Sequence, residues 1–257
     1  MILAIDSGNT HITFGGVAQS NTVTPVFRIP TDTKETDYGY AAKIKQILDL
    51  HHINPTCFEG AVISNVVPQL SIVLKNAVKM LCGMDALVVG AGVKTGLHIC
   101  INDPGTIAAD LVAAAVAVKA LYPLPCMIVD FGTATTLTVV DEKGRYIGGA
   151  ILPGARISLD ALASETALLP HIEICAPKKA IATNTVDSMQ AGIVYGTAGS
   201  VDGLIDRIES ELTMPAASIV ATGGISSVIA SHCRHEMIVD ETLLLKGLEM
   251  IWHKNQK

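Results

Sequence analysis

Two short turns of the type Asp-x-Gly, each set between two apolar strands, constrain this sequence more than any other feature. The first is Asp6-Ser7-Gly8-Asn9-Thr10, after the apolar run 1–5, and the second is Asp130-Phe131-Gly132-Thr133-Ala134, after the run 126–129. The backbone N–H groups and hydroxyls of such a turn can face a phosphate while the carboxylate holds a cation. A single copy also fits an ordinary hairpin. Two copies about half a chain apart instead predict two similar half-domains that close on one nucleotide.

The length and the charge of the chain exclude several classes of protein. Its 257 residues suit two domains of ordinary size or one large domain. Apolar residues make up 49% of the sequence, but no run reaches the roughly 18 uncharged residues of a membrane helix. The net charge of −6 argues against a nucleic-acid surface, which usually needs a basic face. The chain starts directly on a strand, without the basic segment of a signal peptide, so we expect a soluble, cytoplasmic protein.

The cysteines and histidines do not form a recognisable ligand set. The six cysteines are scattered, with no Cys-x-x-Cys pair and no histidine at zinc spacing. We therefore expect reduced thiols, most of them packed in apolar surroundings, rather than disulfides or metal ligands.

The order of the predicted elements indicates an α/β fold with mixed sheets. In the first half, strands are expected at 2–6, 11–17, 24–29, 60–66 and 86–89, and helices at 36–52, 68–81 and 105–121. The second half is expected to hold strands at 126–130, 134–141, 145–151 and 218–222, and helices at 154–164, 186–212 and 241–253. The helix 186–212 is expected to be interrupted by Gly192, Gly196 and Gly199. Residues 122–125, Tyr-Pro-Leu-Pro, resemble a linker, so the predicted domains are 1–121 and 122–257.

Six motifs stand in the order and spacing of the type III pantothenate kinases, and together they make the chain resemble this family over nearly its whole length. They are Ile-Asp-Ser-Gly-Asn-Thr (5–10), Val-Lys-Thr-Gly-Leu (93–97), Asp-Phe-Gly-Thr-Ala-Thr-Thr (130–136), Gly-Gly-Ala-Ile-Leu-Pro-Gly (148–154), Asn-Thr-Val-Asp-Ser-Met-Gln-Ala-Gly (184–192) and Ala-Thr-Gly-Gly (221–224). The resemblance implies two actin-like (ribonuclease H-like) α/β domains with an ATP cleft between them. It also implies a homodimer that phosphorylates pantothenate with ATP to 4′-phosphopantothenate, the first step toward coenzyme A.

The same resemblance assigns residues to the ATP side of the site. Asp6 would hold Mg²⁺ or its water shell between the phosphates, and Asp130 would hold a monovalent cation, K⁺ or NH4⁺. Phosphoryl transfer needs positioning and charge neutralisation more than covalent chemistry, which suits such turns. Gly223 and Gly224 match the superfamily's adenosine motif, although an ordinary strand-to-helix turn explains them equally well. The further ATP contacts implied are Ser7, Gly8, Asn9, Thr10, His11, Ile12, Thr13 and Thr133.

Asp110 lies in a helix of alanines and aliphatic residues, where a carboxylate has little structural purpose. The family places its catalytic base here, to take the proton of pantothenate's primary hydroxyl. The alternative is a solvated aspartate on the outer face of the helix. The resemblance also places the acceptor beside Ile101, Ala108, Ala109, Leu111 and Thr185.

The acceptor side departs from the family pattern. The family's Gly-x-Asp-Arg reads Ala108-Ala109-Asp110-Leu111, so the arginine expected to bind the substrate carboxylate is Leu111. The tyrosine that the family has some nine residues before Asp110 is replaced by Ile101, and the arginine just before that tyrosine is replaced by Cys100. A charge-assisted hydrogen bond contributes about 1.5–3 kcal/mol, so this loss is large enough to change the substrate affinity.

Three explanations of the altered pocket remain open. The chain is a pantothenate kinase that anchors the carboxylate differently, through Lys94, Arg156 or a residue of a second subunit. Alternatively it phosphorylates a less acidic alcohol, or it is a regulatory paralogue that binds nucleotide without turnover. The retention of Asp110 beside a full set of ATP motifs favours an active kinase over the regulatory protein.

Overall fold

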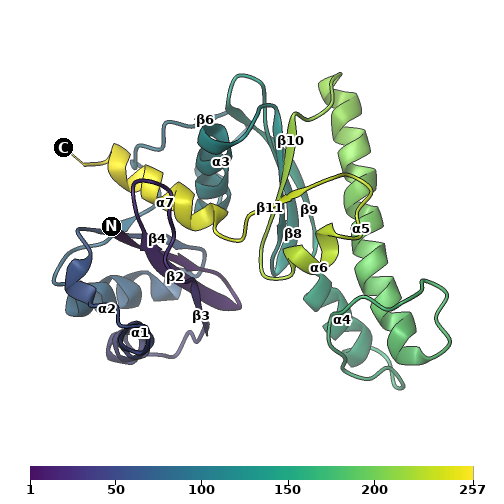
Figure 1. Ribbon diagram of the computed structural model, residues 1–257, viewed down its shortest axis with the longest axis horizontal. Coiled ribbons are helices and arrows are strands. Elements are labelled where there is room, and N and C mark those ends of the chain that lie inside the picture. The colour runs from purple at the N-terminus through teal and green to yellow at the C-terminus, as the bar shows by residue number, and fades with distance from the viewer. Residues whose placement is uncertain (257) are drawn as a thin grey trace. The chain divides into compact units, whose positions relative to one another are not determined.

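The computed structural model describes residues 1–256, which form two compact units, each built on a mixed β-sheet (Figure 1). The first unit comprises residues 1–97, 102–117 and the chain from Thr242 onward, and the second comprises residues 98–101 and 118–241. These units differ from the expected domains, 1–121 and 122–257. The main difference lies at the C-terminus, where the last helix packs with the first unit instead of the second.

The first unit holds a five-stranded sheet in the order β3-β2-β1-β4-β5. Strands β1 and β2 form the expected hairpin, and β4 runs parallel to β1. The strands are β1 (Ile2–Ser7), β2 (His11–Val17), β3 (Phe27–Pro30), β4 (Ala61–Asn65) and β5 (Leu87–Val88). The helices are α1 (Asp37–Leu50), α2 (Ser71–Cys82), most of α3 (Ala109–Leu121) and α7 (Leu243–Lys254), with short 3-10 turns at Pro55–Cys57, Pro68–Leu70 and Pro104–Thr106.

The second unit repeats this plan with a six-stranded sheet in the order β11-β10-β7-β8-β9-β6. Strands β7 and β8 form a hairpin, and β10 runs parallel to β7 as β4 does to β1. The strands are β6 (His98–Ile99), β7 (Cys126–Phe131), β8 (Ala134–Val140), β9 (Arg145–Pro153), β10 (Ser218–Thr222) and β11 (Ile238–Val239). The helices are α4 (Ala155–Ser164), α5 (Thr185–Leu212) and α6 (Ser226–Ala230).

Most expected strands and helices are present, with shifted ends. The short helix α6 and the edge strands β6 and β11 are the elements that the sequence analysis missed. The expected interruption of the helix at Gly192, Gly196 and Gly199 is wrong, because α5 runs through all three without a break. It starts at an N-cap, because the Asn184 side chain accepts a hydrogen bond from the Asp187 N–H at 2.9 Å.

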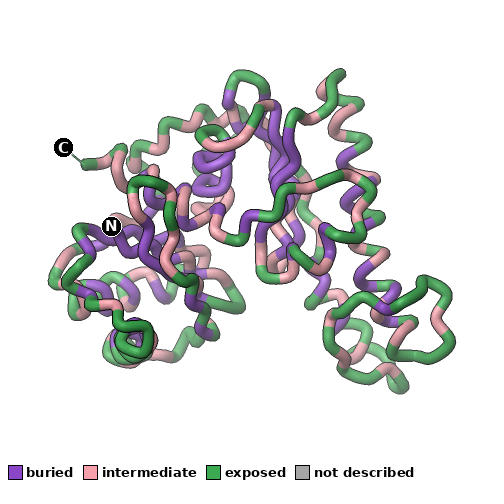
Figure 2. The backbone as a smooth tube through the Cα atoms, viewed as in Figure 1, coloured by how far each residue is buried: buried purple, intermediate pink, exposed green. Residues whose placement is uncertain are grey.

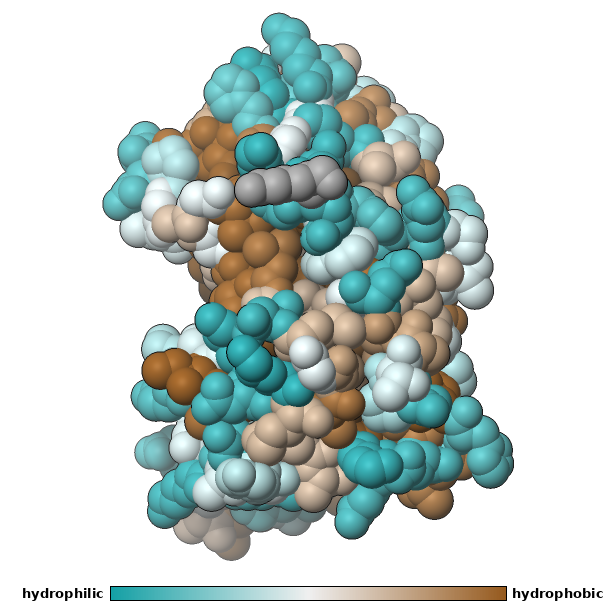
Figure 3. All heavy atoms as spheres, turned by 90° about the vertical axis from the view of Figure 1, so that its left-hand side faces the viewer, coloured by the Kyte–Doolittle hydropathy of each residue, from teal (hydrophilic) through white to brown (hydrophobic). Residues whose placement is uncertain are grey.

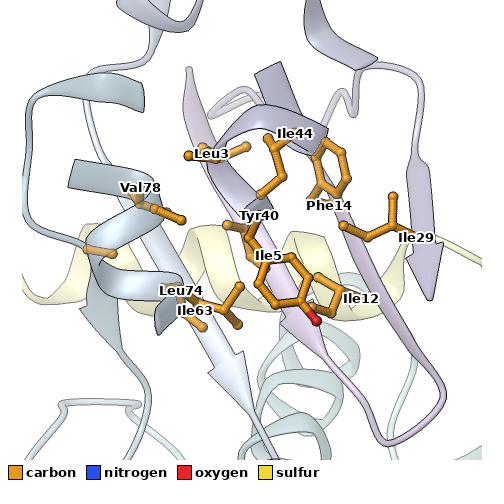
Figure 4. Close-up of a cluster of buried hydrophobic side chains, with 14 of the residues drawn as sticks. Leu3, Ile5, Ile12, Phe14, Ile29, Tyr40, Ile44, Ile63, Leu74 and Val78 are labelled. Carbon is orange, nitrogen blue, oxygen red and sulfur yellow. The ribbon is translucent and has the colours of Figure 1, made fainter. Parts of the chain in front are cut away.

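Successive side chains of a strand point to opposite faces of the sheet, and the apolar ones lie on faces that helices cover. In the first unit, Leu3 and Ile5 of β1 and Ile63 of β4 point into a cluster with Tyr40 and Ile44 of α1, which also receives side chains of α2 (Figure 4). In Figure 2 the strands at the centre of each sheet are buried, whereas the turns and most helix faces are exposed. Residues 2, 4 and 6 of β1 consequently face the other side of the first sheet.

Helix α7 covers this other side of the first sheet. A Cβ built on Gly15 of β2 would lie 3.6 Å from the Leu245 Cδ1 of α7. A Cβ on Gly247 of α7 would lie 1.9 Å from the Ala113 carbonyl oxygen of α3, so only glycine permits this approach. The small side chains of α3 thus let the backbone of α7 come close.

The cysteines are only partly as expected. All six described thiols are free. Cys126 is buried, but Cys57, Cys100 and Cys175 are exposed, so the expectation that most are packed in apolar surroundings is wrong. Cys100, for example, follows the short edge strand β6 and not a strand inside the sheet.

The surface mixes hydrophilic and hydrophobic side chains on the face that Figure 3 shows. Among residues 1–256, no helix combines the length and the apolar character needed to cross a membrane.

Candidate active site

The first Asp-x-Gly turn is a three-residue connection between β1 and β2, residues 8–10. The Gly8 N–H donates to the His11 carbonyl oxygen at 3.0 Å and closes the turn. Thr31, just after β3, holds it from the side: its hydroxyl donates to the Gly8 carbonyl at 2.7 Å, and its N–H donates to the Thr10 carbonyl at 3.0 Å. The turn is thus fixed by a residue that the sequence analysis did not single out.

Asp6 stands between two hydroxyl residues on neighbouring strands. In the register of the sheet it pairs with Thr13 across the hairpin and with Ser64 on the parallel strand β4. Since residues in register share a face, all three side chains project away from the core formed with α1 and α2. Ser64 is fully buried.

The second turn is shorter and contains a backbone hydrogen bond. Only residues 132 and 133 connect β7 and β8, and the Gly132 N–H donates to the Ala134 carbonyl at 3.2 Å. Gly154, directly after β9, lies against this turn. A Cβ built there would lie 2.1 Å from the Thr133 carbonyl oxygen and 2.6 Å from that of Gly132. A glycine is therefore required at position 154 for this turn to keep its shape.

Asp130 repeats the environment of Asp6. It pairs with Thr136 across the hairpin and with Thr222 on the parallel strand β10, so each carboxylate has a hydroxyl residue on both sides. Gly223 then bends the chain with a φ of +94°. A Cβ at Gly223 would lie 2.5 Å from the Asp130 Oδ1 and 2.7 Å from the Phe131 carbonyl oxygen. The sequence analysis named Asp130 and Gly223 for different ligands, and the structure brings them into contact.

Asp110 lies in the first turn of α3, in the first unit. Its Oδ1 accepts a hydrogen bond from the Leu111 N–H at 2.7 Å. Burial raises the pKa of the Asp110 carboxyl, and the hydrogen bonds from the Leu111 and Asp110 backbone N–H groups oppose that shift only in part. The partly buried side chain therefore differs from the solvated aspartate that the sequence left as an alternative, and a carboxylate with a raised pKa is a better proton acceptor.

The residues predicted for the acceptor fall in both units. Ala108, Ala109, Asp110 and Leu111 belong to the first unit and are partly buried, whereas Ile101 and Thr185 belong to the second. Thr185 is the exposed first residue of α5.

Lys94 and Arg156, the two basic residues suggested to bind the substrate carboxylate, form no ion pair with other described residues. The backbone of Lys94 is fixed by Asn255, whose Oδ1 accepts from the Lys94 N–H at 3.0 Å and whose Nδ2 donates to the Lys94 carbonyl at 2.9 Å. The Arg156 Nη1 donates to the Ile172 carbonyl at 3.5 Å. Both side chains carry a charge that a carboxylate could bind.

The donor set fits a magnesium ion that is carried by a nucleotide. Within residues 1–256, no group of three or more histidine, cysteine, aspartate or glutamate side chains could hold a metal on its own. Mg²⁺ usually keeps several waters and is held by one or two carboxylates together with substrate phosphates. A single carboxylate such as Asp6, beside hydroxyl residues and a tight turn, matches that requirement.

A separate cavity of about 460 Å³ lies in the second unit and includes none of the predicted site residues. It lies between α6 and β11, and its basic groups are already paired: the Arg234 Nη2 lies 3.0 Å from the Asp206 Oδ2, and the His235 Nε2 lies 2.8 Å from the Asp206 Oδ1. None of the residues that line this cavity belongs to the predicted motifs, so the candidate site remains at the two turns.

Comparison with known proteins gives one family and close relatives. Residues 2–207 match the family model for type III pantothenate kinase. The type III pantothenate kinase of an Exiguobacterium species is 41% identical over 257 residues, covering 100% of both chains. That of Halalkalibacterium halodurans is 39% identical over 255 residues, covering 99% of this chain and 100% of the relative.

A solved structure supports the fold class. The activator of the 2-hydroxyisocaproyl-CoA dehydratase from Clostridium difficile, solved with bound ADPNP, superimposes with a TM-score of 0.60 at 14% identity, covering 100% of this chain and 98% of that one. The two mixed sheets and this likeness confirm the predicted α/β fold with actin-like domains. The cleft expected between the domains stays a prediction.

Proposed function

Because the chain belongs to the family of type III pantothenate kinases, we propose that it transfers the γ-phosphoryl group of ATP to pantothenate. The products are ADP and 4′-phosphopantothenate, and the reaction is the first step of coenzyme A biosynthesis. The observation that carries the mechanism is the repeated arrangement in the two units, where a strand ends in a carboxylate flanked by hydroxyl residues and followed by a tight turn.

The first turn contributes charge neutralisation on the ATP phosphates. Asp6 would hold Mg²⁺ or its water shell, and the polar residues among 7–13 would offer hydrogen-bonding groups to the phosphates, whereas Ile12 lies in the core cluster. Mg²⁺ held there would supply neutralisation of the negative charge on the phosphates during transfer. Thr31 keeps the turn in shape through its two hydrogen bonds, so the donors do not need to reorganise when ATP binds.

The second turn contributes a site for a monovalent cation, K⁺ or NH4⁺, held by Asp130. The absence of a side chain at Gly223 keeps the Asp130 Oδ1 accessible from that side. Thr133 contacts ATP, and Gly223 with Gly224 gives the adenosine a flat backbone surface.

Asp110 acts as the general base. The oxygen of pantothenate's primary hydroxyl attacks the γ-phosphorus, the bond to the β-phosphate oxygen breaks, and the hydroxyl proton passes to the Asp110 carboxylate. Burial supports this role because it raises the pKa of the carboxyl and so makes the carboxylate a stronger base. The hydrogen bond from the Leu111 N–H to the Asp110 Oδ1 fixes the orientation of the carboxylate.

The acceptor pocket is less polar than the family pattern, since Leu111 and Ile101 replace an arginine and a tyrosine. We propose that Lys94, Arg156 or a second subunit anchors the pantothenate carboxylate. The second candidate is a kinase for a less acidic alcohol, which the apolar Leu111 favours. The proposed assembly is a cytoplasmic homodimer, and the net charge of −6 supports small-molecule rather than nucleic-acid partners.

The test is ADP release by purified protein with and without pantothenate, Mg²⁺ and K⁺. Turnover should need all three, and Asp110→Asn should lower kcat by about 10²–10⁴-fold, the usual contribution of a general base. Asp103→Asn is the matched control: Asp103 also begins a helical turn and accepts an N–H, that of Gly105, at 3.1 Å, but it is exposed. ADP release that ignores pantothenate would overturn the substrate assignment. Nucleotide binding without turnover on any alcohol would favour the regulatory protein.

A further inference from the structure

Ser64 carries a buried hydroxyl that the proposed mechanism does not use. Its side chain is fully buried, and its Oγ has no hydrogen-bond partner among residues 1–256. Leaving a buried polar group unsatisfied costs about 1–3 kcal/mol. An alanine at this position would avoid that cost, so the hydroxyl at position 64 is not explained by the stability of the described chain.

The register of the first sheet places this hydroxyl beside Asp6. Asp6 and Ser64 are directly paired on the parallel strands β1 and β4. Leu3 and Ile5 of β1, and Ala61 and Ile63 of β4, all lie in the core cluster with α1 and α2. Asp6 and Ser64 alternate with those residues and so project together from the opposite face.

The second unit repeats the pairing independently. There Thr222 of β10 is paired with Asp130 of β7, and it is only 1% exposed. In both units, therefore, the strand parallel to the carboxylate strand places a buried hydroxyl residue in register with the carboxylate. A hydroxyl can both donate and accept a hydrogen bond, whereas an ionised carboxylate only accepts.

We propose that Ser64 is a positioning residue for magnesium, and that its hydroxyl hydrogen-bonds a metal-bound water beside Asp6. The inference rests on the proposed role of Asp6. A water on Mg²⁺ needs acceptors for its protons, and Asp6 and Ser64 together supply two on adjacent strands. Groups that act through such outer-shell hydrogen bonds typically change metal affinity by 10–100-fold when they are removed.

The experiment measures binding and stability rather than turnover. Thermal unfolding of wild type and Ser64→Ala is followed without ligand and with the non-hydrolysable nucleotide AMP-PNP over a magnesium titration. Without ligand, Ser64→Ala should unfold at the same or a higher temperature, because an unsatisfied group has been removed. With nucleotide, the magnesium concentration at half-maximal stabilisation should rise about tenfold or more. Ser64→Thr, which keeps the hydroxyl, should restore a magnesium requirement near that of the wild type.

Ser218→Ala is the control for loss of a hydroxyl with a known structural partner. The Ser218 Oγ donates to the Pro123 carbonyl at 2.7 Å at the start of β10, so its loss should lower the unfolding temperature without changing the magnesium requirement.

The outcomes separate the two proposals. If magnesium and nucleotide do not stabilise the wild type, the assignment of the first turn fails. If they stabilise wild type and Ser64→Ala at equal magnesium concentrations, the assignment of the turn stands and the role of Ser64 is refuted. A lower unfolding temperature of ligand-free Ser64→Ala would show a structural hydrogen bond and would also contradict the inference.

Discussion

Replacing Gly223 by alanine tests whether the close contact of this residue with Asp130 shapes the second turn. The added Cβ would lie 2.5 Å from the Asp130 Oδ1, which can rotate, but also 2.7 Å from the Phe131 backbone carbonyl, which cannot move without the strand. The φ of +94° adds a backbone cost of about 1–2 kcal/mol for any L-residue. Overpacking of this kind costs a further 1–3 kcal/mol or so. The free energy of unfolding should therefore fall by about 2–5 kcal/mol in total.

Gly83→Ala provides the matched control. Gly83 ends α2 with a φ of +71°, and no atom lies within 4 Å of the position its Cβ would take. This variant carries only the backbone cost of about 1–2 kcal/mol. The difference between the two variants, about 1–3 kcal/mol, isolates the contact with β7.

Urea unfolding measures the loss of stability, and turnover at several K⁺ concentrations measures the K⁺ requirement. Gly223→Ala should be the less stable variant and should need more K⁺ for turnover, because the Asp130 carboxylate is displaced. Gly83→Ala should keep the wild-type K⁺ requirement. Equal destabilisation of the two variants, with an unchanged K⁺ dependence of turnover, would refute the reasoning that position 223 must lack a side chain to leave room for the Asp130 carboxylate.

Two further predictions concern the acceptor pocket and acid stability. If position 111 still faces the pantothenate carboxylate, Leu111→Arg should lower the pantothenate KM by about tenfold, because it adds one charge-assisted hydrogen bond. Steady-state kinetics measure this KM. An unchanged KM would show that another residue binds the carboxylate. Asp141 is buried, which by itself raises the pKa of its carboxyl, but hydrogen bonds from the Arg145 side chain and the Arg145 and Lys143 N–H groups outweigh burial and hold that pKa below its usual range. A lowered folded-state pKa contributes stability above the unfolded-state value near 3.9, and this stability is lost as the pH falls through the folded-state value. Asp141→Asn should therefore lower the unfolding temperature at pH 7, and the deficit should shrink below about pH 4. A deficit that is the same at pH 3 and pH 7 would contradict this assignment.

The sequence alone predicted the two hairpins and most helices, because their signals are local. Alternating apolar residues, Asp-x-Gly turns and helix caps such as Asn184 act within a few residues of the chain. The ends of the elements were less accurate. Helix α6 and the short edge strands were missed, since two to five residues carry too little periodicity to be distinguished from a loop.

The partners of the site carboxylates could not be predicted in the same way. Ser64, Thr222 and Thr31 are ordinary small polar residues in the sequence, and only the strand register and the packing of the turns place them beside the site. Gly154 was noticed within a motif, but its reason, the contact with the Thr133 carbonyl, exists only in the folded chain.

The sequence by itself thus predicted which groups are available for chemistry: two carboxylate turns expected to bind phosphates and cations, a carboxylate in an apolar helix, and a leucine where the family pattern has an arginine. The tertiary structure decided which groups stand together. It assigned the last helix to the first unit through the contact of Gly247 with Ala113, and it gave each carboxylate a hydroxyl residue on the adjacent parallel strand. The physical reason is that burial and register depend on contacts between residues far apart in the sequence, which no local pattern encodes.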